Sequence, residues 1–126
     1  MKMYRIGVLL VFVVVLAGCD ADVFGTSTRD IVGSYELKQH EDFETYYLYG
    51  PQETGWGVID GTFEKIGWNS RYILVLQHDD GNGGDWRIID TKSNSISPLL
   101  TKTQVEINRD VGGIETYSAS VAWHKL

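Results

Sequence analysis

Tyr72-Ile73-Leu74-Val75-Leu76 is the most informative stretch of this chain, because five apolar or aromatic residues follow one another without a polar interruption. A strand with one exposed face alternates apolar and polar side chains, whereas a strand covered on both faces carries an unbroken apolar run. Turn residues bound the run, with Asn69-Ser70 before it and the loop Asp79–Asp85 after it. The stretch therefore predicts a central strand that is covered on both sides.

Segments on both sides of this run alternate apolar with polar residues, as in residues 34–38, 43–49, 59–64, 86–90 and 117–124. Period-two alternation is typical of strands with one exposed face. The alternation changes phase at Ile66-Gly67-Trp68, which predicts a bulge or turn at Gly67. We therefore predict an α+β, mostly β fold with a single antiparallel β-meander or curved sheet of about five to seven strands.

One segment after Pro98 favours a helix instead. Thr101 and Gln104 have the spacing of a capping box, and Gly112-Gly113 is a suitable stop. Val105 and Ile107 also fit a strand, because polar residues follow each of them, so a strand remains the alternative. We favour one short helix near 101–111, whose apolar stripe would be Leu100, Ile107, Val111 and Ile114.

Residues 1–18 have the layout of a secretory signal peptide, with Lys2 and Arg5 ahead of an apolar run over residues 7–16. We expect this segment to form a signal-peptide helix. The run is shorter than the roughly 20 residues that a membrane span needs. Leu16-Ala17-Gly18-Cys19 resembles the lipobox of bacterial lipoproteins, and the resemblance implies acylation of the Cys19 sulfur and cleavage before Cys19. The alternative is an ordinary signal peptide, or a buried hairpin, with an incidental cysteine.

Acyl chains on Cys19 would anchor the protein in a membrane, since each buried methylene contributes about 0.8 kcal/mol. The mature chain would have 108 residues (126 minus 18), with a polar tether over 19–30 and a single β-rich domain over 31–126. Cys19 is the one cysteine, which excludes an internal disulfide. Asp20 resembles a signal for retention in the inner membrane, facing the periplasm, of a Gram-negative host. In another host the anchor would lie on the outer face of the cytoplasmic membrane.

The mature protein is acidic. The chain has 11 Lys and Arg and 17 Asp and Glu, and two basic residues lie in the leader, so the mature balance is 9 minus 17, or −8. This balance argues against a nucleic-acid partner, which requires a basic stripe. It favours either plain solubility or a surface complementary to a basic protein partner.

Three segments resemble a family of small, uncharacterised bacterial lipoproteins: Lys65-Ile66-Gly67-Trp68-Asn69, Tyr72-Ile73 and Trp86-Arg87-Ile88-Ile89-Asp90. That family shares the pattern "IGW(N/D)xxYI … (W/Y)xIID", and the match covers about residues 57–98. The resemblance implies the fold and an envelope location, but no activity and no cofactor. Residues 69–72 and 123–126 are also similar to a loop and a tail of periplasmic lysozyme-inhibitor lipoproteins, whose disulfide this chain lacks.

The sequence offers one weak metal candidate. Asp79, Asp80, Asn82 and Asp85 could supply the oxygen ligands that Ca²⁺ prefers. On the calcium-loop template, however, Gly81 and Gly83 occupy ligand positions, and a glycine-rich hairpin loop explains the same residues. We therefore predict no metal and no cofactor. Nucleophile-elbow, phosphate-loop and dinucleotide motifs are absent from the sequence, so we predict no catalytic residues and a protein that is not an enzyme.

Exposed aromatic residues beside acidic ones are the best lead to a contact surface, because Tyr and Trp are frequent anchors of protein interfaces. The sequence-based candidates for partner contact are Tyr46, Trp56, Glu41, Asp42 and Glu44. The predicted function is that of a lipid-anchored, non-catalytic binding module, such as an inhibitor, immunity or accessory protein. The alternatives are an envelope or cell-wall hydrolase, or a structural envelope lipoprotein with no separable ligand.

Overall fold

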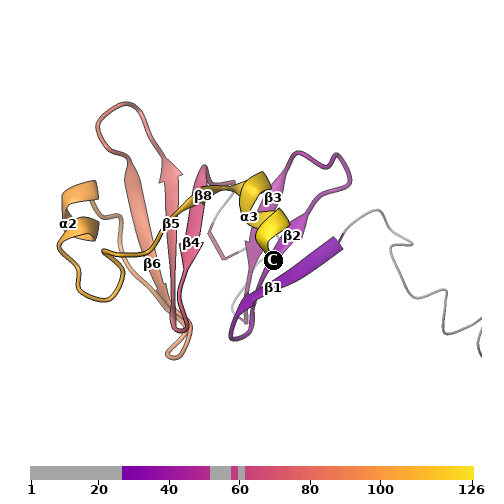
Figure 1. Cartoon of the computed structure of the whole chain (residues 1–126), viewed down its shortest axis with the longest axis horizontal. Helices are drawn as coiled ribbons and strands as arrows, with labels where there is room; N and C mark the ends of the chain where they lie inside the picture. Colours follow the sequence, from indigo (N-terminus) through magenta and orange to yellow (C-terminus); the bar gives the residue numbers. More distant parts are fainter. Residues whose placement is uncertain (1–26, 52–57, 60–61) are drawn as a thin grey trace, which may run out of the picture.

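The computed structural model describes residues 27–51, 58–59 and 62–126 (Figure 1). A three-stranded antiparallel sheet has the order β1-β2-β3, formed by β1 (Ser27–Val32), β2 (Tyr35–Gln39) and β3 (Tyr46–Tyr49). A five-stranded antiparallel sheet has the order β7-β6-β5-β4-β8, formed by β4 (Lys65–Trp68), β5 (Tyr72–His78), β6 (Asp85–Asp90), β7 (Ser95–Ile96) and β8 (Tyr117–Ser118). The described residues also form the helices α2 (Lys102–Glu106) and α3 (Ala119–Lys125).

The mostly β, antiparallel fold with a short helix after residue 100 is confirmed, but the prediction of a single sheet is wrong. Among the strands that the structure describes, β3 pairs with β2, and β4 pairs with β5 and β8. Period-two alternation shows that a strand has one apolar face, but it contains no information about which strands pair. Two sheets can each cover the apolar face of the other, and the chain uses this arrangement.

β5 is the central strand that its sequence predicts, and its successive side chains enter two different cores. Ile73 and Val75 lie in the core between the two sheets, whereas Leu74 and Leu76 lie on the opposite face of the five-stranded sheet. Because successive side chains of a strand point to opposite faces, one unbroken apolar run supplies both cores. Figure 1 shows the resulting layers, with α2 on one side of this sheet and α3 and the three-stranded sheet on the other.

The first core joins the two sheets and α3. It is formed by buried residues of β2, β3, β4, β5, β6 and α3, together with two from the connection between β3 and β4: Tyr35, Leu37, Tyr46, Leu48, Ile59, Phe63, Ile66, Ile73, Val75, Ile89, Ala122 and Trp123. The second core lies beneath α2 and consists of Leu74, Leu76, Trp86, Val105 and Val111. Two cores that share β5 give this small domain its stability without a disulfide.

α2 has the capping box that the sequence predicts. The Thr101 hydroxyl accepts a hydrogen bond from the Gln104 backbone N–H at 3.2 Å, and the Gln104 side chain accepts one from the Thr101 N–H at 2.9 Å. The helix ends at Glu106, however, and not near residue 111. Ile107 is 75% exposed at the C-cap, so the predicted apolar stripe through Ile107 is wrong. Val111 is buried from a turn beyond the helix.

The prediction of a strand over residues 117–124 is wrong beyond Ser118. β8 is only two residues long, and the chain then turns into α3, which buries Ala122 and Trp123. Ala119, Ala122 and Trp123 lie three and four residues apart, which is the spacing of one helix face. Ala119 and Trp123 also fit the two-residue alternation of a strand. The chain forms the helix instead, because the helix packs Ala122 and Trp123 into the core between the sheets.

Two boundaries differ from the sequence prediction. Gly67 forms no bulge, because β4 runs through it in regular register with Leu74. A Cβ on Gly67 would lie 2.3 Å from the Glu115 carbonyl oxygen, so the glycine is needed for the close passage of the segment before β8. Residues 27–30, which we assigned to the tether, belong to β1. Such polar residues can form an edge strand, which requires only backbone pairing with β2.

Candidate functional site

The turn between β2 and β3, residues 40–45, is called the hairpin tip below. It carries Phe43, whose side chain is 69% exposed and whose backbone φ is +59°. Left-handed backbone conformation is unfavourable for a bulky residue, and an exposed phenyl ring gains no burial in the folded chain. The turn is fixed by two backbone hydrogen bonds, His40 N–H to the Thr45 carbonyl at 2.8 Å and Phe43 N–H to the His40 carbonyl at 3.0 Å.

Asp42 orders the hairpin tip through its carboxylate. It accepts hydrogen bonds from the backbone N–H groups of Glu44 and Thr45, both at 2.9 Å, and from the Thr45 hydroxyl at 2.6 Å. The Thr45 hydroxyl bond, followed by the two backbone bonds, lowers the pKa of Asp42 to about 2. Asp42 is therefore a charged turn residue, and its oxygens already have partners within the tip.

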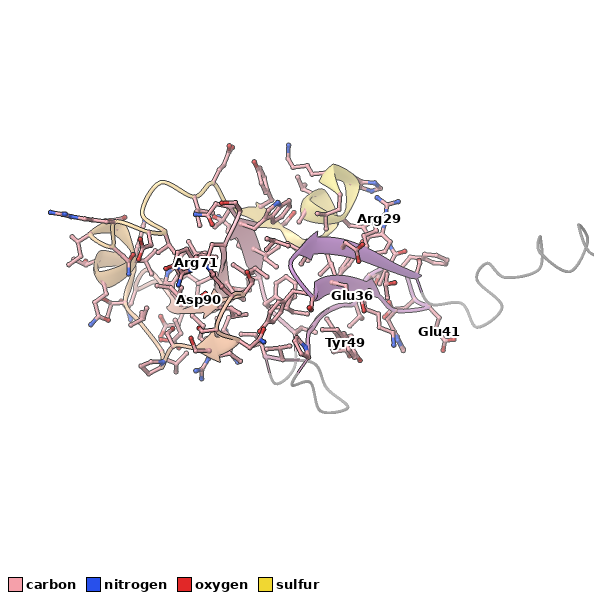
Figure 2. The ribbon with its side chains drawn as sticks, turned by 90° about the horizontal axis from the view of Figure 1, so that it is seen from below. Arg29, Glu36, Glu41, Tyr49, Arg71 and Asp90 are labelled. Carbon is pink, nitrogen blue, oxygen red and sulfur yellow. The ribbon has the colours of Figure 1, made fainter. Side chains whose placement is uncertain are left out.

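The sequence-based contact candidates separate into three groups. Glu41, Asp42 and Glu44 are exposed at the hairpin tip, as expected (Figure 2 labels Glu41). Tyr46 is only 6% exposed, so its assignment to a contact surface is wrong. Its hydroxyl accepts a hydrogen bond from Gln39 Nε2 at 3.1 Å, and its ring packs 5.9 Å from the Trp123 ring. Trp56 lies outside the described residues.

The tyrosines on the outer face of β3 are Tyr47 and Tyr49, each half-buried. Tyr47 packs edge-on against His40 with ring centroids 6.3 Å apart, and the Lys38 ammonium lies 4.7 Å from the centroid of the Tyr49 ring. Leu48 points inward opposite Leu37, and this pairing directs Tyr47 and Tyr49 outward. Phe43 could have been found as the apolar residue within an acidic turn.

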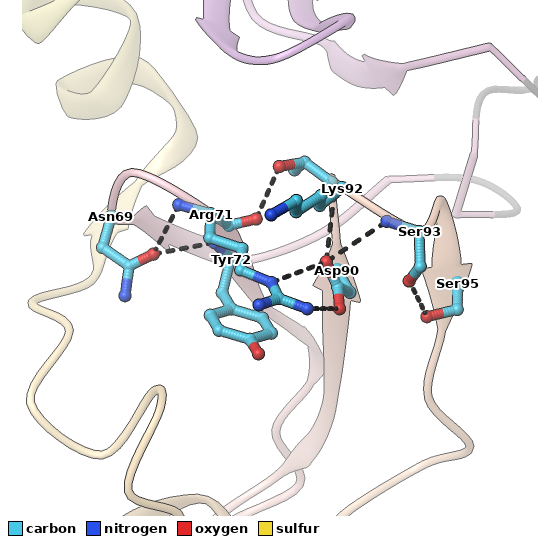
Figure 3. Close-up of polar contacts among 8 residues, drawn as sticks. Asn69, Arg71, Tyr72, Asp90, Lys92, Ser93 and Ser95 are labelled. Atoms are coloured by element: carbon cyan, nitrogen blue, oxygen red, sulfur yellow. Dashed lines mark hydrogen bonds and ion pairs between the residues drawn. The ribbon is translucent and has the colours of Figure 1, made fainter.

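A second polar cluster joins the β4–β5 turn to the β6–β7 turn (Figure 3). The Arg71 guanidinium donates to both Asp90 carboxylate oxygens, from Nε at 3.1 Å and from Nη2 at 2.9 Å. Arg71 holds the pKa of Asp90 well below its usual range, and Asp90 in turn raises the pKa of Arg71. The same carboxylate accepts backbone N–H bonds from Lys92 at 3.0 Å and from Ser93 at 3.4 Å.

The neighbouring groups of this cluster also bind the backbone. Asn69 Oδ1 accepts from the N–H groups of Arg71 and Tyr72 at 2.9 and 2.7 Å, and Asn69 Nδ2 donates to the Asp110 carbonyl at 3.1 Å. Thr91 N–H donates to the Arg71 carbonyl at 3.0 Å. These bonds connect the β4–β5 turn to the β6–β7 turn, and they assign the cluster a structural role.

The residues of the calcium candidate do not form a ligand cage. The carboxylates of Asp79 and Asp80 accept bonds from the backbone N–H groups of Gly81 and Asn82, at 2.8 and 3.2 Å. Gly81, Gly83 and Gly84 all have positive φ, as a glycine-rich hairpin loop requires. In the described part of the chain, no three His, Cys, Asp or Glu side chains are grouped so that they could hold a metal ion.

No family model, no curated protein and no solved structure matches this chain. Among the helices that the structure describes, none has the length and apolar character needed to cross a bilayer. The candidate site is therefore defined by geometry alone: the hairpin tip combines an exposed aromatic ring with a left-handed backbone at Phe43.

Proposed function

We propose that the protein is a lipid-anchored protein of the bacterial cell envelope, which binds a basic protein partner through the hairpin tip and catalyses no reaction. The observation that supports the proposal best is Phe43, an exposed phenyl ring on a left-handed backbone. A left-handed conformation costs a non-glycine residue about 1–2 kcal/mol, and glycine would remove this cost. A partner that buries the ring accounts for phenylalanine at this position.

The charges around Phe43 indicate the chemistry of the partner. Glu41, Asp42 and Glu44 are exposed sequence neighbours of Phe43, on a mature chain of net charge −8 (9 minus 17, without the leader). Complementary charges raise the rate of encounter, and aromatic anchors slow dissociation once the complex has formed. We therefore expect a basic surface with an apolar pocket for the phenyl ring, and an association rate that falls as salt is added.

Site-specific photo-crosslinking in membranes tests the contact surface. A photoreactive residue in place of Phe43 should crosslink one basic protein, whereas the same residue in place of Ile107 should not. Ile107 is the matched control, because it is an apolar residue of similar exposure at the C-cap of α2. With the captured partner in hand, Phe43→Gly should raise the dissociation rate at least tenfold without lowering the melting temperature. Equal crosslinking from both positions would contradict the proposal.

The anchor is tested separately. Cys19→Ser removes the sulfur that the acyl chain requires, so labelled palmitate should no longer be incorporated and no mature lipoprotein should be released. A Cys19→Ser protein that stays processed and membrane-bound would show that the anchor assignment is wrong.

A further inference from the structure

The hairpin tip lies at the end of the domain where the chain enters from its N-terminal side. Ser27, the first residue of β1, pairs with Gln39, the last residue of β2, and the tip begins at His40. Figures 1 and 2 show the same relation, with the β2–β3 turn and the start of β1 at one end of the long axis and α2 at the other. The tip and the entry point therefore share one end of the molecule.

The length of the connection to Cys19 limits how far this end can stand from a bilayer. Eight residue steps separate Cys19 from Ser27. A fully extended chain spans at most about 3.3–3.6 Å per residue, so the reach is at most about 30 Å. A domain of about 100 residues has a radius of gyration of about 13 Å, which makes its length comparable to this reach. The end near Ser27 is therefore held closer to the membrane than α2 is.

We infer that the hairpin tip faces the bilayer and binds a basic patch on the outward surface of a membrane-embedded protein. This inference rests on the proposed function for its anchor and its partner, and on the pairing of Ser27 with Gln39 for its geometry. A partner that is confined to the same membrane is held at high local concentration, so a small tip can be effective.

The charge of the tip distinguishes a protein from the lipid itself. Glu41, Asp42 and Glu44 are exposed, and anionic headgroups repel carboxylates. Loops on the outer side of a cytoplasmic membrane are poor in Lys and Arg, so a basic patch there would mark one membrane protein among many. The acidic tip thus fits a selective protein contact better than insertion of Phe43 into lipid.

Energy transfer in vesicles tests the orientation without any partner. The full acylated chain is placed in vesicles of phosphatidylethanolamine and phosphatidylglycerol that carry a lipid-linked acceptor dye. Glu41→Cys and, as the matched control in α2, Thr103→Cys each provide one free thiol for a donor dye, because Cys19 is acylated. Transfer should be stronger from residue 41 than from residue 103. Equal or reversed transfer overturns the orientation. Quenching of the residue 41 dye by a quencher buried among the acyl chains shows insertion into lipid, and also overturns the inference.

A lengthened tether tests the membrane-bound partner. Insertion of about 20 Gly and Ser residues after Ala21 lets the hairpin tip move through a larger volume, which lowers its local concentration at the membrane surface. The yield of the crosslink from position 43 should fall severalfold in membranes, while the dissociation rate of the purified complex stays unchanged. An unchanged yield would mean that the partner is not confined near the bilayer, and the proposed function would still stand. Crosslinking that is equally strong from position 107 contradicts the proposed function, whatever the transfer experiment shows.

Discussion

Asp42 makes the stability of the hairpin tip depend on pH. Its pKa is about 2 in the folded chain, below the ordinary aspartate value, because the charged form accepts bonds from the Thr45 hydroxyl and from two backbone N–H groups. A group with a depressed folded pKa stabilises the fold above its unfolded pKa, and this contribution disappears as the pH falls through the folded pKa. The hairpin tip should therefore loosen between about pH 4 and pH 2.

Carboxyl-carbon NMR titration checks this prediction for Asp42. The midpoint should lie near 2 in the native protein. Thr45→Val removes the bond with the largest effect, so the midpoint should rise toward the ordinary aspartate value. Identical midpoints in the two proteins would show that the Thr45 hydroxyl does not bind the carboxylate in solution.

Gly67 should tolerate no side chain. A Cβ at this position would lie 2.3 Å from the Glu115 carbonyl oxygen and 2.7 Å from Ile114 Cγ2. Gly67→Ala must therefore displace the segment before β8, and overpacking of this kind costs about 1–3 kcal/mol. Urea unfolding gives the free energy directly. Gly113→Ala is the control, because nothing lies within 4 Å of its Cβ position. Equal effects of the two substitutions would contradict the close contact.

Sequence reasoning succeeded for those side chains whose environment is set locally. The Thr101–Gln104 capping box and the buried residues of β5 could be predicted from spacing and from an unbroken apolar run. Tyr46 could not, because three tyrosines in four positions fit either phase of β3. The pairing of Leu48 with Leu37 decides the phase, and that contact is not local.

α3 contributes one aromatic ring that packs against the three-stranded sheet. Trp123 is buried against Tyr46, and the Arg29 guanidinium lies 4.4 Å from the centroid of its ring. Arg29 Nη1 also donates to the Trp123 carbonyl at 2.6 Å. The helix therefore links the edge strand β1 to the core between the sheets.

Substitutions in α3 distinguish a helix from the strand that the alternation predicted. In a strand Val121 and Trp123 would share a face, whereas in α3 Val121 is 47% exposed. Trp123→Ala should cost about 3–5 kcal/mol in free energy of unfolding. Val121→Ala should cost less than about 0.5 kcal/mol. Comparable losses from both substitutions would support the strand.

The helix at residues 119–125 was difficult to predict because its local signals are weak. The Ser118 side chain forms no cap hydrogen bond, and the first turn contains no acidic residue. A seven-residue helix is unstable in isolation, so packing on the core must hold it. The capping box of α2 is a local signal, and for this reason the shorter helix was the easier one to predict.

The two sheets should unfold together. Their shared core combines residues of both, such as Leu37 and Leu48 from the first sheet and Ile66 and Ile73 from the second. Loss of either sheet would expose the apolar face of the other, which disfavours a half-folded state. Far-UV circular dichroism and tryptophan fluorescence should give the same urea midpoint. Two separate transitions would show that the sheets are independent units.

The pairing of strands that are distant in the sequence could not be predicted from the pattern of apolar and polar residues. The pairing of β4 with β8 joins Ile66 to Tyr117, and the segments between them give no local sign of this contact. The candidate site was found in part, because its acidic residues are visible in the sequence. Its aromatic residue was assigned to Tyr46 and not to Phe43, since exposure depends on the complete fold.

The position of β5 has a consequence for exchange with solvent. β5 pairs with β4 on one side and with β6 on the other, and its faces carry two cores. No local opening can free its amides without separating both neighbours or emptying both cores, so they should exchange hydrogen for deuterium only through global unfolding. Mass spectrometry in heavy water should find peptides over residues 72–76 labelled last, and those over the hairpin tip labelled first. The rate at which the β5 amides exchange would then report the rate at which the whole domain unfolds.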